Sequence, residues 1–134
     1  MDGSPASEKM LHFAVDLCHR FSASLCIVSA LPNSQFNPLG MEISEIQAQE
    51  EKFREEQVHK LNQFLINFDF SGVTIKKQFL FGTPANVILN IAEDFNYDLI
   101  VMDATGHSRL HNVVMGSTTR KVLRYTPCSL LVVR

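Results

Sequence analysis

The stretch Leu99-Ile100-Val101-Met102 decides the fold, because four apolar residues in a row stand directly before a polar loop, Asp103 to Asn112. A short apolar run of this kind predicts a β-strand that is covered on both faces, as in a parallel sheet. After the loop, Gly116-Ser117-Thr118-Thr119 begins a short helix that reaches Tyr125. The apolar run Cys128–Val133 follows and is expected to form the next strand.

Toward the N-terminus the same alternation of helix and strand continues. The expected elements are, in chain order, a helix through Phe21 that begins at Ser4-Pro5, a buried strand over Leu25–Leu31, a long amphipathic helix from about Glu42 to Phe68, a sheet-edge strand over Val73–Phe79 and a helix that begins at Thr83-Pro84. Strands that alternate with helices predict right-handed crossovers and a mostly parallel sheet with helices on both faces. The sequence therefore predicts an α/β, doubly wound fold. A helix stands where such folds usually begin with a strand, so we expect the chain to be truncated by about one strand at its N-terminus.

Length and composition fit a single domain that spans residues 1–134. The chain is 46% hydrophobic and 19% charged, which is ordinary for a globular protein with a core and excludes a disordered chain. The net charge is −2, so dedicated nucleic-acid binding is not expected. No apolar run reaches the ~18–20 residues of a membrane span, and no signal peptide is recognisable. Three widely spaced cysteines, Cys18, Cys26 and Cys128, indicate buried free thiols and a reducing cytoplasm.

Two loops have the composition of a ligand site at the carboxyl ends of parallel strands. One is Asp2-Gly3-Ser4-Pro5, and the other runs from Asp103 to Thr119. Within the second loop, Gly106 allows a ligand close to the backbone because it has no Cβ. Gly116-Ser117-Thr118 offers free backbone N–H groups, hydroxyl donors and the positive end of a helix dipole, which together suit a phosphate. The same residues also form an ordinary helix cap, so phosphate binding and capping are both open at this point.

These motifs carry a resemblance to a known family. The stretches Val101–Ser108, Gly116-Ser117 and Val122–Arg134 resemble the universal stress protein family, and Asp2–Ser7 resembles the signature that follows the family's first strand. The resemblance covers essentially the whole chain. It implies a five-stranded parallel sheet of order 3-2-1-4-5 and a homodimer formed through the last strand, Cys128–Val133. One branch of the family binds ATP through a Gly-x2-Gly-x9-Gly-Ser/Thr motif, and another branch lacks the motif and does not bind it.

Transferred residue by residue, the resemblance implies a site for ATP, AMP or ADP with Mg2+. Asp2 would contact the adenosine end, a backbone group near Leu25 would meet the adenine, and Met102 would line the same pocket. Arg109 either neutralises phosphate charge or is a plain exposed arginine. The set of nucleotide-binding residues implied by the resemblance is Asp2, Leu25, Met102, Asp103, Thr105, Gly106, Arg109, Gly116, Ser117, Thr118 and Thr119.

The phosphate end of this implied site follows the family motif except at one position. Gly106 and Gly116 match the second and third motif glycines, and Ser117 matches the hydroxyl position. Thr118 and Thr119 would donate to phosphate oxygens. Asp103 stands at the position of the first motif glycine. A carboxylate there repels a nucleotide unless a metal or a lysine intervenes. A like-charge contact at ~4 Å costs about 1 kcal/mol in water and several in a partly dry cleft. Asp103 is therefore interpreted either as a turn residue or as a metal or ribose contact.

The expected truncation is the second departure from the family. Without a first strand, the strands Leu25–Leu31 and Leu99–Met102 lack the neighbour that they would share. We expect that an upstream segment is missing, that the chain is a piece of a larger protein, or that a partner chain fills this position. Each possibility weakens Asp2 as a ligand contact, because Asp2 would lie on a frayed terminus.

Three hypotheses for function follow. The leading one is a cytoplasmic regulatory module that binds ATP or AMP with little or no turnover. The alternative is a dimeric interaction domain, either stand-alone or part of a larger protein such as a transporter, that has lost nucleotide binding. An enzyme whose main task is ATP hydrolysis is the weakest, because the sequence offers no catalytic set and no metal-ligand pair at helical spacing.

Overall fold

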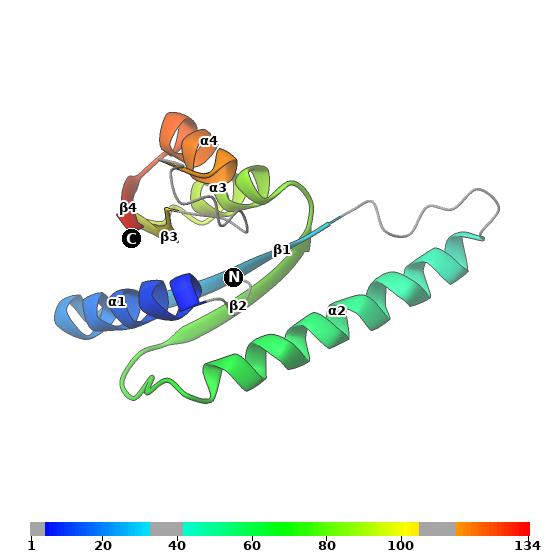
Figure 1. The fold of residues 1–134 in the computed structure, drawn as a ribbon, viewed down its shortest axis with the longest axis horizontal. Coiled ribbons are helices and arrows are strands. Elements are labelled where there is room, and N and C mark those ends of the chain that lie inside the picture. Colours follow the sequence, from blue (N-terminus) through cyan, green and yellow to red (C-terminus); the bar gives the residue numbers. More distant parts are fainter. Residues whose placement is uncertain (1–4, 33–41, 105–114) are drawn as a thin grey trace.

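The computed structural model describes residues 5–32, 42–104 and 115–134 (Figure 1). Helices and strands alternate along the chain: α1 (Pro5–Phe21), β1 (Leu25–Leu31), α2 (Ile43–Leu65), β2 (Ile75–Phe81), α3 (Pro84–Asp94), β3 (Leu99–Asp103), α4 (Ser117–Tyr125) and β4 (Ser129–Val133). This alternation confirms the α/β class. β1 has the expected bounds, whereas β2 begins two residues later than expected. The reason is a turn, in which the N–H of Val73 donates to the carbonyl oxygen of Phe70 at 2.9 Å.

Local sequence signals explain where the helices begin. α3 begins at Pro84 after its N-cap Thr83, as expected, although the Thr83 side chain makes no capping hydrogen bond. α2 begins with a capping box, in which Glu42 and Glu45 satisfy each other's backbone N–H groups. α1 begins at Pro5, whose fixed φ suits the first helical position. Ser4, the expected N-cap of α1, lies outside the described residues.

The strands form two parallel pairs rather than one continuous sheet within the described residues. β1 pairs with β2 from Leu25↔Ile75 onward, and β3 pairs with β4 from Leu99↔Ser129 onward. Figure 1 shows the long β1–β2 pair set apart from the shorter β3–β4 pair. The expected five-stranded sheet is therefore not observed in this part of the chain. The interruption lies between β1 and β3, which is where the resemblance places the family's first strand.

Each strand pair has its own core. The core of the first pair unites α1 and α2 with β1 through buried side chains, which are Leu11, Val15, Ile27, Leu61 and Leu65. The core of the second pair unites α3, β3 and α4 through Ala85, Met102 and Val122. α1 also contacts β3 and β4, and α3 also contacts β1, so these two helices connect the pairs.

Two further expectations concern the burial of the three cysteines and the absence of a membrane span. Cys18, Cys26 and Cys128 are free, as expected, but only Cys18 is buried; the other two are half-buried. The expectation of buried thiols is thus confirmed for Cys18 alone. Among the described helices, none is both long and apolar enough to cross a membrane.

Candidate functional site

The carboxyl end of β3 is fixed by a chain of hydrogen bonds that also sets the start of α4. The N–H of Ala104 donates to the carbonyl oxygen of Val133 at 3.0 Å, which continues the β3–β4 ladder by one residue. The N–H of Gly116 then donates to the carbonyl oxygen of Ala104 at 2.9 Å. The Thr119 hydroxyl, on a residue only 2% exposed, donates to the carbonyl oxygen of Asp103 at 3.0 Å. These bonds hold the first turn of α4 beside the end of β3.

A large cavity opens at this place and extends between the two strand pairs. We call it the central cavity; its volume is about 1010 Å³. Its walls come from one side of α1, one side of α3, the strands β1 and β3, and the first residues of α4. Leu99 borders it and is 40% exposed, so β3 is not covered on both faces as the sequence suggested.

The structure brings together every predicted site residue that it describes. All seven line the central cavity, and they are Leu25, Met102, Asp103, Gly116, Ser117, Thr118 and Thr119. The other four, Asp2, Thr105, Gly106 and Arg109, lie outside the described residues. Residues predicted for the adenine end and residues predicted for the phosphate end therefore line the same cavity. They differ in the donors and surfaces that they offer to a ligand.

Three of these positions offer less to a ligand than the sequence pattern indicates. Leu25 is the first residue of β1, at the amino end of the strand, whereas parallel sheets hold ligands at the carboxyl ends. Met102 is 8% exposed and packs in the core with Ala85 and Val122. The Thr119 hydroxyl has one proton, and that proton is donated to the Asp103 carbonyl oxygen.

Ser117 and Thr118 remain the best-placed donors, because the N–H of Gly116 already donates to the carbonyl oxygen of Ala104. Gly116 is the N-cap of α4 and has an extended backbone, with φ −62° and ψ 156°. Because glycine has no side chain, the backbone N–H groups of the first helical turn receive no side-chain cap from it. The Ser117 side chain is exposed and Thr118 is half-exposed, and both residues line the cavity.

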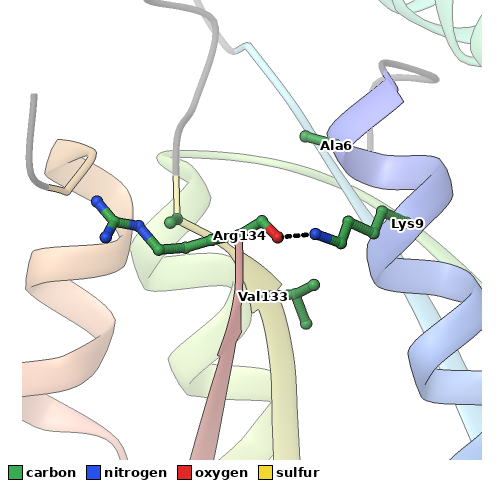
Figure 2. A pocket seen from close by; sticks show the side chains of 5 residues that line it. Ala6, Lys9, Val133 and Arg134 are labelled. Carbon is green, nitrogen blue, oxygen red and sulfur yellow. Dashed lines mark hydrogen bonds between the residues drawn. The ribbon is translucent and has the colours of Figure 1, made fainter. Parts of the chain in front are cut away.

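A second, smaller pocket of about 140 Å³ adds two cations that sequence reasoning missed. It is lined by Ala6, Lys9, Ala104, Val133 and Arg134, and Figure 2 shows it between the start of α1 and the ends of β3 and β4. The Lys9 ammonium donates to the backbone oxygen of Arg134. Lys9 thus lies at the carboxyl edge next to Ala104, the residue after Asp103. The sequence feature that could have identified Lys9 is its position in the first turns of a helix that begins at this edge.

Tyr97 and Cys26 form a polar contact within the central cavity. Burial, together with a hydrogen bond to Cys26, raises the pKa of Tyr97 to about 12. Burial also raises the pKa of the Cys18 thiol, which lines the same cavity. Both groups are therefore neutral at physiological pH, and neither is an activated nucleophile.

The described residues offer little that could hold a metal ion. Within them, no group of three or more His, Cys, Asp or Glu side chains lies close enough to hold a metal ion. Asp103 is a single carboxylate at the cavity's end. A single carboxylate is a fitting partner for Mg2+ only when a substrate's phosphates supply further ligands.

Comparison with known proteins places this geometry in context. The profile described as "Universal stress protein family" matches residues 1–134. A universal stress protein of Methanocaldococcus jannaschii is 31% identical over 138 residues, which cover 99% of this chain and 78% of that protein. The solved structure of the universal stress protein UspA from Lactobacillus plantarum superposes with a TM-score of 0.76 at 28% identity, over 100% of this chain and 93% of that one. A universal stress protein solved in complex with cAMP shares the fold, with a TM-score of 0.68 at 20% identity over 100% and 92% of the two chains.

Proposed function

Since this chain belongs to the universal stress protein family, we propose that it is a regulatory protein that binds an adenine nucleotide, ATP or AMP, with little or no turnover. One observation carries the proposal: the uncapped first turn of α4 opens into the central cavity beside the end of β3. Backbone N–H groups at a helix start attract phosphate through direct hydrogen bonds and through the helix dipole. The fold relative solved with cAMP supports a nucleotide as the phosphate-bearing ligand.

The proposed roles follow from what each group has available. Ser117 and Thr118 bind phosphate oxygens at the start of α4, and Gly116, which has no Cβ, lets the phosphate come close to the backbone there. Thr119 instead positions this turn, because its hydroxyl already holds the Asp103 carbonyl oxygen. Leu25 and Met102 line the apolar part of the cavity, and Asp2, Thr105, Gly106 and Arg109 keep the contacts that the family motif implies.

Asp103 fits this proposal through a divalent cation. Its carboxylate lies where the family motif has glycine, so a bare nucleotide would meet a like charge. Mg2+ bound by the nucleotide's phosphates accepts such a carboxylate as a further oxygen ligand and removes the repulsion. The chemistry supplied by the cation is charge neutralisation, while this chain supplies the carboxylate and the helix-start donors.

We propose further that the chain is a single domain, that it forms a homodimer and that it resides in the cytoplasm. β4 pairs with β3 along one edge, and no second strand partner of β4 is found within the described residues. That edge, over Ser129–Val133, is therefore available for pairing with the same strand of a second copy. Three free cysteines support a reducing compartment such as the cytoplasm.

The test is a calorimetric titration of Mg-ATP into the protein beside the variant Asp103→Gly. Saturable binding by the unmodified chain is expected, together with a stabilisation of about 2.7 kcal/mol at a hundredfold excess over Kd. With Mg2+ removed by EDTA, affinity should fall for the unmodified chain and change less for Asp103→Gly. No binding by either protein would overturn the proposal.

A second function is favoured by Asp103 itself, because it interrupts the nucleotide motif. In that case the chain is a dimeric interaction domain that has lost its ligand. The titration separates the two: silence from the unmodified chain with binding restored in Asp103→Gly supports the interaction domain. The interaction-domain hypothesis would be supported further by a stable dimer that dissociates when β4 carries a proline, as in Leu131→Pro.

A further inference from the structure

The smaller pocket lies at the carboxyl ends of β3 and β4, and within the described residues its lining shares no member with the central cavity. We call it the edge pocket; it is lined by Ala6, Lys9, Ala104, Val133 and Arg134. Ala104 and Val133 are buried and form an apolar floor. Lys9 and Arg134, the two charged residues of the lining, are both cations. An anionic group is therefore the class of ligand that suits the edge pocket.

Lys9 has hydrogen-bonding capacity that the fold does not use. Its ammonium donates to the backbone oxygen of Arg134, which the dashed line in Figure 2 marks. An ammonium group has three protons to donate and no acceptor, so two remain for another partner. Lys9 is exposed, and among the described residues no carboxylate forms an ion pair with Lys9 or with Arg134. The backbone bond thus fixes the position of a positive charge without neutralising it.

Arg134 places a second positive charge on the other side of the strand end. In Figure 2 the Lys9 side chain reaches the end of β4 from α1, whereas the Arg134 side chain extends away from Lys9, on the side of the view where the orange ribbon of α4 runs. A guanidinium group offers five N–H donors in a planar fork that matches phosphate oxygens in pairs. The end of β4 is therefore flanked by an ammonium and a guanidinium group.

Ala104 connects the edge pocket to the start of α4. Its N–H donates to the carbonyl oxygen of Val133 at 3.0 Å, and its own carbonyl oxygen accepts the N–H of Gly116 at 2.9 Å. One residue is thus both part of the pocket floor and the anchor of the helix start. A ligand with one phosphate at the start of α4 can extend further phosphates toward the edge pocket. A monophosphate has no group that reaches beyond the helix start.

We propose that Lys9 and Arg134 hold the terminal phosphates of a nucleoside triphosphate whose first phosphate is bound at the start of α4. The protein thereby selects a triphosphate over a monophosphate. This inference rests on the proposed function and deepens it, because donors at the start of α4 alone do not distinguish ATP from AMP. The chain as a whole has a net charge of −2, so the two cations are a local feature of this edge. Hydrogen bonds between such cations and phosphate are roughly twice as strong as neutral ones.

The first experiment compares two nucleotides on two proteins. Mg-ATP and Mg-AMP are each titrated by calorimetry into the unmodified protein and into Lys9→Met, which keeps an unbranched side chain and removes the ammonium. We expect ATP affinity to fall at least about tenfold and AMP affinity to change less than about twofold. Lys9→Arg keeps the charge and should retain most of the preference for ATP. An unchanged ATP affinity in Lys9→Met, or an equal loss for both nucleotides, would overturn the inference.

A matched lysine separates a local contact from an effect of net charge. Lys52 is exposed on α2 and lines neither the central cavity nor the edge pocket. Lys52→Met makes the same change in side chain and in net charge, and its ATP affinity should equal that of the unmodified protein. If Lys52→Met weakened ATP binding as much as Lys9→Met, the loss would reflect the overall charge of the protein. That result would overturn the role of Lys9.

The second cation is tested in the same way. Arg134→Met should also weaken ATP binding and leave AMP binding unchanged. The double variant Lys9→Met with Arg134→Met should bind ATP no more tightly than it binds AMP, because neither side chain remains to hold the terminal phosphates. A double variant that still prefers ATP as strongly as the unmodified protein does would overturn the inference.

Two further outcomes separate this inference from its alternatives. If neither nucleotide binds the unmodified protein, the proposed function and the inference fail together; if both nucleotides bind with one affinity in every variant, the proposed function stands and the inference alone is overturned. Inorganic pyrophosphate is then titrated into the ATP-saturated protein, where we expect no binding, because the phosphates of ATP fill the edge pocket. Pyrophosphate binding that is lost in Lys9→Met would assign the pocket to a free anion and would also overturn the inference.

Discussion

The first and second halves of the molecule share one plan and differ at the carboxyl edges of their strands. Each half is a parallel strand pair with helices packed on a small core. In the second half, bonds from Ala104, Gly116 and Thr119 fix a helix start at the end of β3. In the first half, the described bond at the end of β1 runs from the Gly82 N–H to the Leu31 carbonyl oxygen, at 2.8 Å.

This difference shows what turns a strand end into a ligand site. The strands of both halves are paired along their length, so strand pairing alone does not create a ligand site. What the second half adds is a side chain, Thr119, that holds a helix start against the strand, where Gly116–Thr118 line a cavity.

The largest effect is expected from the core of the first half. Leu61 is 6% exposed and packs with Leu11, Val15 and Ile27. Leu61→Ala should lower the free energy of unfolding by about 2–5 kcal/mol, because it removes buried methyl groups and leaves a cavity. Urea unfolding measures this, with Leu123→Ala as the control; Leu123 is 53% exposed, and its loss should cost within about 0.5 kcal/mol. Nucleotide affinity below the unfolding transition should be unchanged by either variant.

The turn at the end of β2 offers the next test. Gly82 has φ +149°, and a Cβ there would lie 3.0 Å from Val87 Cγ2. Gly82→Ala should therefore cost about 2 kcal/mol, from backbone strain and crowding together. Gly72 has φ +77° with nothing within 4 Å of a Cβ, so Gly72→Ala should cost about 1 kcal/mol from strain alone. Equal losses in thermal unfolding would show that crowding by Val87 plays no part.

Removing the bond that distinguishes the second half should have a smaller effect on stability. Thr119→Val keeps the side-chain shape but leaves the Asp103 carbonyl oxygen without its hydroxyl donor, at an expected cost of about 1 kcal/mol. Thr119→Ser retains the hydroxyl and should keep most of the stability. If Thr119 positions the start of α4, nucleotide affinity should fall with Thr119→Val and stay with Thr119→Ser. A loss in both variants would point to the methyl group instead.

The smallest effect concerns Tyr97 and alkaline pH. Burial and the bond to Cys26 raise its pKa from 10.0 to about 12, so the fold favours the neutral phenol. The resulting stabilisation is present in full below about pH 10 and is lost as pH rises through about 12. Melting temperatures of the unmodified protein should therefore fall more steeply over this window than those of Tyr97→Phe. Parallel curves for the two proteins would contradict the assignment.

The sequence predicted the elements well and their spatial relation less well. The apolar run Leu25–Leu31 predicts a strand buried on both faces; the structure has the strand with the same bounds, but only Ile27, Ser29 and Leu31 are buried. The turn at Ser71-Gly72 predicts a strand from Val73 onward, but the N–H of Val73 closes a turn with Phe70. Periodicity carries no information about such turn bonds. The two separate strand pairs likewise depend on long-range pairing, which a local pattern does not contain.

The candidate site was predicted from motif spacing, and spacing does not say which donors are already used. Ser117 and Thr118 line the cavity, whereas the N–H of Gly116 donates to the carbonyl oxygen of Ala104 and the Thr119 hydroxyl donates to the carbonyl oxygen of Asp103. Lys9 was overlooked because it lies more than ninety residues from the motif and meets Arg134 only after folding.

The most direct measurement is a calorimetric titration of Mg-ATP into Gly116→Val and Thr83→Val. Both positions are helix N-caps with extended backbone and no side-chain capping bond. Gly116 lines the central cavity, whereas Thr83 does not appear among its lining residues. If the start of α4 binds phosphate, Gly116→Val should bind at least tenfold more weakly than the unmodified protein, and Thr83→Val should bind equally well. Unchanged affinity in Gly116→Val would contradict the central claim.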